Sequence, residues 1–374
     1  MSEKKKVLII TEPFKYGGMN LVALRLQQTI DADKFECTYC VRHDEERGPM
    51  DEYVRSTGVR VIYQHENDLS YFKSYKYYMN LFKNEHFDIV HSHYPFYSTI
   101  PMLAARKSGI KVRITHSHFS TEIHKDFSKI KHFLVLLYRC IMRNILCYNA
   151  TNILACSVPS GEYLVGKRGF RKKGIILNNG IDTSKYELNY GIRNKIRNEF
   201  NIDNDTTVIG HIGLMYYIKN QFFLLDVFNE YQKLHPGSVL MLVGDGDDRK
   251  ALEQKCKCLK IKDKVIFTGL RDDVNELLMA MDCMVFPSLH EGFPLTLVEA
   301  QAAKLPCIVS DSVIKGVKLN DNLCFCSLND TIDTWCKAID NQLKYDRDSI
   351  DISRVCSEFD LFKIAKKLEK IYMQ

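Results

Sequence analysis

No segment of this chain is long and apolar enough to cross a bilayer, and none reads as a secretory signal. A membrane-spanning helix needs about 20 uninterrupted apolar residues, and the nearest candidate, residues 133–147, is interrupted by Arg139, Arg143 and Asn144. The first apolar run, residues 7–10, is shorter than the stretch of about 7 or more that a signal peptide requires. We therefore expect a cytoplasmic protein.

The sequence also lacks a second pair of cysteines at the spacing of metal ligands. Its 13 cysteines are an odd number and are scattered through apolar runs, as buried small hydrophobic residues would be. Cys37 and Cys40 form a CxxC pair, but no second pair stands at metal-ligand spacing. We expect free thiols in a reducing compartment, with no disulfide and no structural zinc.

Low-complexity tracts are absent, which excludes disordered and fibrous classes and leaves an ordinary globular composition of 45% hydrophobic and 26% charged residues. At about 150 residues per domain, 374 residues predict two domains. Residues 1–185 carry a net charge of +10 and residues 186–374 a net charge of −4. The basic half is suited to an anionic surface, although simple drift of surface charge explains it equally well.

Apolar runs of strand length alternate with segments of helical length, which is typical of parallel sheets covered by helices on both faces. The first series of expected strands is 7–11, 35–41, 59–63, 87–93, 111–117, 152–157 and 174–180. The second series is 208–213, 239–246, 264–269, 283–288, 305–311 and 323–327. The fold class is therefore α/β.

The two series predict two doubly wound domains. We place the first in residues 1–185 and the second in residues 186–357, with residues 358–374 forming a helix that packs back on the first domain. Ligands of such sheets lie at the carboxyl ends of the strands. The expected active site is a cleft between the domains.

The strongest chemical signal is residues 287–311, PSLHEGFPLTLVEAQAAKLPCIVSD. Pro294 suits the first turn of a helix with an apolar face. Glu291 and Gly292 would then stand at a helix N-terminus, where free amides bind anions or sugar hydroxyls. Because glycine has no side chain, a ligand could approach the backbone at Gly292.

Glu299 lies about five residues into this predicted helix, roughly 7 Å along its axis from Pro294. Glu291 and Glu299 would therefore contact different parts of one elongated ligand, and a carboxylate can accept hydrogen bonds from the vicinal hydroxyls of a ribose or sugar. A helix-dipole partner at Glu291 and a solvated Glu299 explain the spacing equally well. The spacing alone leaves both interpretations open.

Further segments give the chain a family resemblance. They are LVGDGDDRKALE, VIFTGLRDDVNELLMAMD, ACSVPSGEYLVG and NNGID. With the signature of Glu, seven residues and Glu, they make most of the chain similar to glycosyltransferase family 4, and most closely to bacterial capsule and exopolysaccharide transferases. The resemblance implies a GT-B architecture, in which two Rossmann-like domains face each other across a cleft. It also implies sugar transfer with retention of anomeric configuration, no metal or other cofactor, and a nucleotide-diphosphate sugar, by default a UDP-sugar, bound to the C-terminal domain.

The same resemblance implies roles for residues of the second domain. Glu299 would hold the ribose hydroxyls, Glu291 would contact the donor sugar, and Lys219 would bind the diphosphate. The other donor-binding residues that it implies are Gly244, Gly246, Leu270, Arg271, Gly292, Phe293, Pro294 and Leu295. The strand end at residues 269–271 would meet the base, and an ordinary turn is the alternative there.

In the first domain, Gly17 and Gly18 occupy the place of the family's glycine-rich donor loop. The resemblance puts His116 at the family's cleft histidine, which contacts the donor sugar, and makes His93 and His118 candidate acceptor contacts. Polar residues capping strand ends are the alternative for both. With His91, these histidines alternate at two strand ends as metal ligands can, but no acidic cluster accompanies them and the family uses no metal, so we expect none.

The main departure from the family lies at Leu214. The family's phosphate clamp pairs an arginine with a lysine five residues later, and this chain has Lys219 but Leu214 in the arginine's place. Losing one charge-assisted hydrogen bond costs about 1.5–3 kcal/mol, or roughly 10- to 100-fold in binding. Activity would be weakened, rescued by another cation or lost.

The expected partners are a nucleotide sugar, a saccharide or lipid-linked acceptor and no nucleic acid. Residues 129–148 combine basic and apolar side chains in a helix suited to lie on an anionic membrane, which predicts peripheral association with its inner face. A buried helix explains the segment nearly as well. Two other functions remain open, an inactive sugar-nucleotide-binding partner and a GT-B epimerase or phosphorylase, although no extra basic cluster supplies a phosphorylase's phosphate or pyridoxal site.

Overall fold

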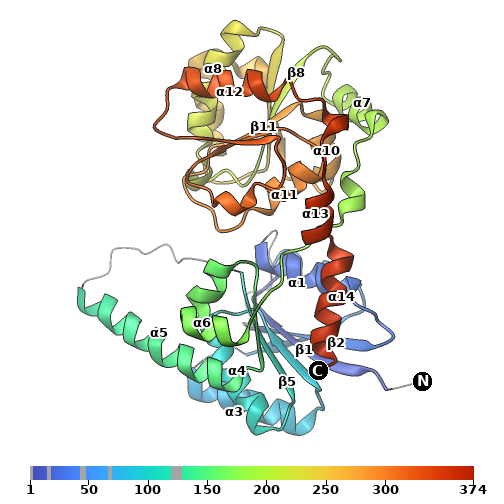
Figure 1. The fold of residues 1–374 in the computed structure, drawn as a ribbon, viewed down its shortest axis with the longest axis vertical. Coiled ribbons are helices and arrows are strands. Elements are labelled where there is room, and N and C mark those ends of the chain that lie inside the picture. Colours follow the sequence, from blue (N-terminus) through green and yellow to red (C-terminus); the bar gives the residue numbers. More distant parts are fainter. Residues whose placement is uncertain (1–2, 15–17, 43–47, 66–69, 119–128) are drawn as a thin grey trace. The chain divides into compact units, whose positions relative to one another are not determined.

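The computed structural model describes residues 3–14, 18–42, 48–65, 70–118 and 129–374, which form two compact units (Figure 1). Unit 1 comprises the chain up to Gly180 together with Leu361–Gln374, and unit 2 comprises Ile181–Asp360. The chain thus passes from unit 1 to unit 2 and returns for its last helix.

Unit 1 is built on a parallel seven-stranded sheet in the order β3-β2-β1-β4-β5-β6-β7. Its strands are β1 Lys5–Thr11, β2 Phe35–Arg42, β3 Arg60–Gln64, β4 Ile89–Ser92, β5 Val112–Ser117, β6 Asn152–Ala155 and β7 Gly174–Ile176. Its helices are α1 Gly18–Thr29, α2 Asp51–Ser56, α3 Tyr71–Asn84, α4 Thr99–Lys107, α5 Lys129–Asn149, α6 Val158–Lys173 and α14 Leu361–Tyr372. Every residue of β4 is buried, as expected of a central parallel strand covered on both faces.

The C-terminal helix α14 is part of unit 1 because it packs on the edge of that unit's core. Lys5 Nζ donates to the carbonyl of Tyr372 at 3.2 Å, and the Asp31 amide donates to Glu369 Oε1 at 3.1 Å. The Tyr372 ring is buried and meets Phe35 edge to face, with centroids 5.4 Å apart. The last helix therefore brings a tyrosine hydroxyl into the interior of unit 1.

Unit 2 is a parallel six-stranded sheet in the order β10-β9-β8-β11-β12-β13. Its strands are β8 Thr207–Ile212, β9 Ser238–Val243, β10 Val265–Gly269, β11 Cys283–Phe286, β12 Cys307–Ser310 and β13 Leu323–Cys326. Its helices are α7 Tyr190–Glu199, α8 Gln221–Leu234, α9 Arg249–Leu259, α10 Val274–Ala280, α11 Leu295–Ala302, α12 Ile332–Gln342 and α13 Ser353–Glu358. Buried residues of its strands and helices form one apolar cluster on each face of the sheet.

Both sheets reverse their strand order at one point, which fixes where a ligand site belongs. The reversal falls between β1 and β4 in unit 1 and between β8 and β11 in unit 2. In open parallel sheets, the segments that follow the strands at such a point leave on opposite faces and create a crevice. The segments after β8, β11, β1 and β4 are therefore the places to look for chemistry.

The cysteines agree with the sequence prediction, because all 13 are free. Burial raises the pKa of Cys37 to about 12 and that of Cys40 to about 11, so both are protonated thiols at neutral pH. None of the described helices has the length and apolar character required to traverse a bilayer.

Candidate functional site

Two loops at the reversal point of unit 2 are tied together by hydrogen bonds. The first runs from Gly213 after β8 into a short 3₁₀ turn, Tyr217–Lys219, and the second comprises residues 287–294 after β11. The Leu289 amide donates to the Ile218 carbonyl at 2.8 Å, and Asn220 Nδ2 donates to the Pro287 carbonyl at 3.2 Å. Groups far apart in sequence are thereby held in a fixed relation at the carboxyl end of the sheet.

Lys219 and Glu291 form an ion pair across these loops. Lys219 Nζ lies 2.6 Å from Glu291 Oε1 and 5.3 Å from the centroid of the Phe286 ring. The two side chains are 22% and 13% exposed, so the pair is shielded but can be reached from solvent. In such a setting the lysine can leave the carboxylate to bind a phosphate, and the carboxylate can then accept a hydrogen bond from a sugar hydroxyl.

The start of α11 differs from the prediction made at Pro294. The helix begins at Leu295, and Pro294, with φ −74° and ψ 107°, is the extended residue that precedes it. Glu291 and Gly292, predicted to stand at the helix N-terminus, accordingly lie in the loop that precedes it. The prediction was wrong because the Leu297 amide bonds the Pro294 carbonyl, which makes Pro294 the cap of the helix. The partner of Glu291 is Lys219 and not the dipole of α11.

Gly244 and Gly246 are needed by the protein itself. A Cβ on Gly244 would lie 2.2 Å from the Gly213 carbonyl oxygen, and one on Gly246 would lie 2.5 Å from that of Met215. Hydrogen bonds from the Met215 amide to the Asp245 carbonyl, and from the Asp248 amide to the Met215 carbonyl, close the same contact. These glycines let the loop after β9 support the segment that leads to Lys219.

Sequence reasoning missed two residues that position this segment, His211 and Gln221. His211 Nδ1 lies 2.9 Å from the Val285 carbonyl and must donate to it, so Nε2 is left to accept from Gln221 Nε2 at 3.3 Å. The same Gln221 amide donates to the Leu214 carbonyl at 3.0 Å. Burial lowers the pKa of His211 to about 4, which keeps the ring neutral in this role. A histidine within a buried strand was the available signal.

The other predicted donor residues of unit 2 lie in varied surroundings. Arg271 bridges Glu199 at 2.7 Å and Asp273 at 2.6 Å, so its guanidinium is engaged by carboxylates, while Leu270 beside it is exposed. Phe293 stacks on Phe359 with centroids 5.5 Å apart. Glu299 is partly buried in the middle of α11, and Gly292 and Leu295 are partly buried near its start.

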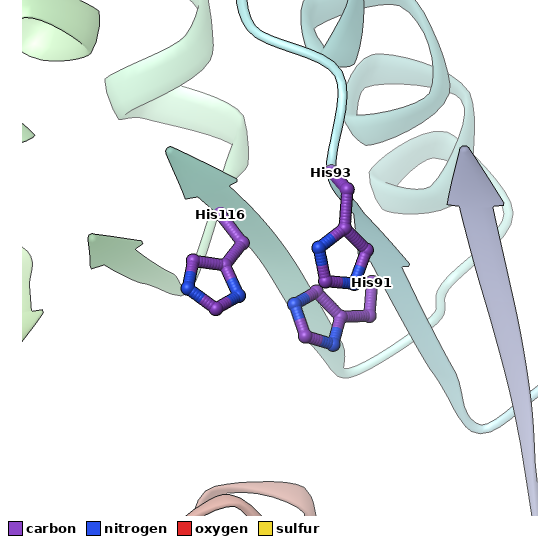
Figure 2. Close-up of side chains that lie close together, drawn as sticks. All are labelled: His91, His93 and His116. Carbon is purple, nitrogen blue, oxygen red and sulfur yellow. The ribbon is translucent and has the colours of Figure 1, made fainter. Parts of the chain in front are cut away.

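Four histidines cluster at the ends of β4 and β5 in unit 1. Residues two apart on a strand share a face, and both pairs, His91 with His93 and His116 with His118, point to the same place. Ring centroids are 4.3 Å apart for His91 and His93, 5.1 Å for His93 and His116, and 4.1 Å for His116 and His118. Figure 2 shows the first three rings gathered from two neighbouring strands. The structure thus brings together His93, His116 and His118, all predicted site residues.

A hydrogen-bonded chain fixes the protons of two of these rings, His118 and His93. The Asn179 Oδ1 acceptor lies 3.1 Å from His118 Nδ1, which must therefore donate. His118 Nε2 then accepts from His93 Nδ1 at 2.9 Å, so the remaining nitrogen of a neutral His93, Nε2, carries a lone pair. His91 Nδ1 meets the Tyr372 hydroxyl of α14 at 2.7 Å.

Neither ring nitrogen of His116 makes a hydrogen bond of ordinary geometry with the described part of the chain, although its side chain is fully buried. Burial holds the pKa of His93 and of His116 well below the usual range, the latter against a weaker effect of the Leu177 backbone. It lowers the pKa of His91 to about 3 and that of His118 to about 4. The cluster is therefore neutral at physiological pH.

The predicted glycine-rich loop of unit 1 falls partly outside the described residues. Gly17 lies outside the described residues, and Gly18 is the first residue of α1. The helix begins directly after the segment that follows β1, at the reversal point of the sheet.

Comparison with known families places both units in one group of enzymes. Residues 16–185 match the family described as Glycosyltransferase Family 4, and residues 192–322 match the family described as Glycosyl transferases group 1. The matched ranges contain the histidine cluster and the Lys219–Glu291 pair respectively.

Three individual proteins illustrate the similarity. EpsF of Bacillus subtilis (strain 168), named as a glycosyltransferase, is 30% identical over 90% of this chain and 88% of its own. The UDP-Gal:alpha-D-GlcNAc-diphosphoundecaprenol alpha-1,3-galactosyltransferase of Escherichia coli is 25% identical over 96% of this chain and 94% of its own. The crystal structure of Anabaena HepE in complex with UDP superposes with a TM-score of 0.78 at 18% identity, over 98% of each chain. At that identity the structural likeness shows the GT-B fold alone.

Proposed function

Because this chain belongs to glycosyltransferase family 4 and is a glycosyltransferase of GT-B fold, we propose that it transfers a sugar from a UDP-sugar to a saccharide or lipid-linked saccharide, with retention of anomeric configuration. The observation that carries the proposal is the Lys219–Glu291 pair at the reversal point of unit 2. The relatives support its finer terms, because one is named for UDP-Gal and a diphosphoundecaprenol-linked acceptor. We place the reaction in bacterial surface polysaccharide synthesis, in the cytoplasm.

In this proposal unit 2 binds the donor. Lys219 leaves Glu291 to neutralise the departing diphosphate, and Glu291 turns to the hydroxyls of the donor sugar. Glu299, one helical turn beyond the start of α11, holds the ribose. Stabilising charge on the leaving group is the major catalytic contribution in such a site, where donors are preorganised and water is limited.

The chemistry needs few reacting protein atoms. In a front-face substitution, the departing phosphate oxygen accepts the proton of the acceptor hydroxyl while the bond to the anomeric carbon changes partner on one face of the sugar. No metal takes part, because Lys219 and backbone amides supply the positive charge. His116 of unit 1 is assigned to the donor sugar, and His93 and His118 to the acceptor. Because His116 and His93 are fully buried, substrate binding must open this part of unit 1 to reach them.

A thermal-shift screen of the purified protein over UDP-, GDP-, ADP- and CDP-sugars tests the proposed function. A ligand at 100 times its dissociation constant stabilises the native state by about 2.7 kcal/mol. We expect UDP-sugars to raise the melting temperature and the other classes to have little effect. Leu214→Arg should bind the UDP-sugar roughly 10- to 100-fold more tightly, because it restores a charge-assisted bond to the diphosphate.

The structure offers room for that arginine, since the Leu214 residue is 44% exposed and its hydrogen bonds, from Gln221 and from the Tyr216 amide, go to its backbone carbonyl. Leu234→Arg is the matched control, because Leu234 is an exposed leucine at the far end of α8. No shift with any nucleotide sugar, in the wild type or in Leu214→Arg, would contradict the proposed function.

We also propose that unit 1 docks on an anionic membrane through α5. Phe133, Leu134, Leu137 and Ile141 share one face of the helix and are 65%, 55%, 48% and 50% exposed. Figure 1 shows this helix extending beyond α4 and α6 of its own unit. An exposed apolar face on a net basic domain is the pattern of an interfacial helix.

Vesicle flotation tests the membrane contact. We expect the wild type to float with vesicles that contain anionic lipid, and Phe133→Ser with Leu137→Ser to reduce the floating fraction several-fold, because about 0.8 kcal/mol is lost for each CH₂ no longer buried in the bilayer. Tyr53→Ser, an equally exposed aromatic residue on α2, is the control. A wild type that stays entirely in the soluble fraction would contradict the proposal.

A further inference from the structure

The histidine cluster of unit 1 contains several buried ring nitrogens without hydrogen bonds, which is unusual for a purely structural core. Among the described residues, His91 Nε2 and both ring nitrogens of His116 are fully buried without a hydrogen-bond partner of ordinary geometry, apart from a weaker interaction of His116 with the Leu177 backbone. A buried polar atom left unpaired costs about 1–3 kcal/mol, so three in one place call for a ligand that the protein alone does not supply. One ring nitrogen from each of His91, His93 and His116 lies within 4.8 Å of the others.

We propose that His91, His93 and His116 bind a single borderline transition-metal ion of the Zn²⁺ class. This site goes beyond the proposed transfer reaction, in which no metal takes part. Neutral imidazoles are the preferred ligands of Zn²⁺, Ni²⁺ and Cu²⁺, whereas Mg²⁺ and Ca²⁺ require oxygen ligands. Since the cluster consists of imidazoles alone, it selects the former class, and three of them leave the fourth position of a tetrahedron to water.

The proton arrangement in the cluster fits this role. The chain from Asn179 through His118 leaves His93 Nε2 with its lone pair directed away from the hydrogen bond. When His91 donates from Nδ1 to the Tyr372 hydroxyl, its unpartnered Nε2 likewise becomes a ligand. His118 and Tyr372 therefore orient the metal-binding rings, as groups behind metal-bound histidines usually do.

The geometry needs only side-chain adjustment to close on an ion. With Zn–N distances of about 2.0–2.1 Å, tetrahedral ligand nitrogens lie about 3.4 Å apart, so the rings must approach by roughly 1 Å through small rotations. His91 and His93 are carried on β4 and its end, His116 on β5, and the register of these strands fixes the distance between their backbones. His118, which is only partly buried, connects the cluster to the surface.

Metal binding is measured on full-length protein without a polyhistidine tag, stripped with a chelator and titrated with Zn²⁺ against a chromophoric competitor and with Co²⁺ by its visible absorption. We expect one ion per chain and a tetrahedral Co²⁺ spectrum. His116→Asn should abolish this binding, and Tyr372→Phe, which keeps the buried ring, should weaken it about 10- to 100-fold. His86→Gln, at an exposed histidine of the same unit, should leave it unchanged.

Because His116 also serves in the proposed transfer, bound metal withdraws it from the donor sugar, so Zn²⁺ should slow transfer and a chelator should restore the rate. This inhibition test alone rests on the proposed function, whereas the metal stoichiometry and the Co²⁺ spectrum are measured without substrate. If His116→Asn fails to fold, Tyr372→Phe carries the test. Equal affinity of the wild type, His116→Asn and Tyr372→Phe for Zn²⁺, or no binding by the wild type, would overturn the site.

Discussion

Replacing Lys219 by alanine is expected to lower turnover by about 10²- to 10³-fold, the usual effect of removing one preorganised donor from a developing negative charge. Lys219 lies in the loop at the reversal point of unit 2, and its Nζ is 2.6 Å from Glu291 Oε1. In this chain the loss is not shared with a neighbouring arginine, because Leu214 stands in that position. The rate constant kcat, measured with a UDP-sugar and acceptor, is the readout.

The variant should remain folded, which separates a catalytic from a structural role. Lys219 is partly exposed in a loop, and its loss leaves Glu291, at 13% exposure, able to draw in water. Lys337→Ala, which removes a fully solvated ion pair with Asp333 in α12, is the matched control and should keep both rate and melting temperature. Near wild-type transfer by Lys219→Ala would remove this residue from the mechanism.

The sheet architecture was predictable because parallel strands buried on both faces leave a clear record in the sequence. Each expected strand has a counterpart in the structure, and the run 283–288 became β11 at Cys283–Phe286. Ends were less accurate, as at residues 174–180, where β7 stops at Ile176. A strand ends where its backbone groups no longer find hydrogen-bond partners in the neighbouring strand, and local composition does not predict that point.

The site was predictable as a set of residues but not as a set of contacts. The family motif led to Lys219 and Glu291, yet their direct pairing depends on two loops 72 residues apart that the reversal of strand order brings together. The stacking of His91 on His93 likewise follows from the pleat of β4. The roles of His211 and Gln221 required coordinates, because their partners are backbone carbonyls that any sequence would provide.

Acidification is expected to unfold unit 1 of the metal-free protein well before unit 2. Burial depresses the folded-state pKa of four histidines in unit 1, to about 3 for His91, to about 4 for His118 and well below the usual range for His93 and His116. Below pH 6.5 these histidines bind protons in the unfolded chain but not in the folded unit. Their contribution to the free energy of unfolding is therefore fully present above that pH and is lost as the pH decreases towards 4 and 3.

The expected loss is large. Each such histidine lowers the free energy of unfolding by up to about 1.4 kcal/mol per pH unit. Four of them can therefore offset a large part of the roughly 5–15 kcal/mol that stabilises a typical domain. In unit 2, burial depresses the pKa of His211. Unit 1 should therefore be more sensitive to acid than unit 2.

Two probes distinguish the units. Trp335, the single tryptophan and fully buried in unit 2, reports on that unit by fluorescence, while hydrogen exchange of the amides in β4 and β5, corrected for intrinsic rate, reports on unit 1. Between pH 6.5 and 5, protection in β4 and β5 should fall while Trp335 fluorescence stays native. His91→Gln should reduce the pH slope by about 1.4 kcal/mol per unit, and the surface variant His86→Gln should leave it unchanged. Equal protection of β4 and β5 at pH 7.5 and pH 5 would mean that the four buried rings accept protons without unfolding, and that their neutrality does not stabilise unit 1.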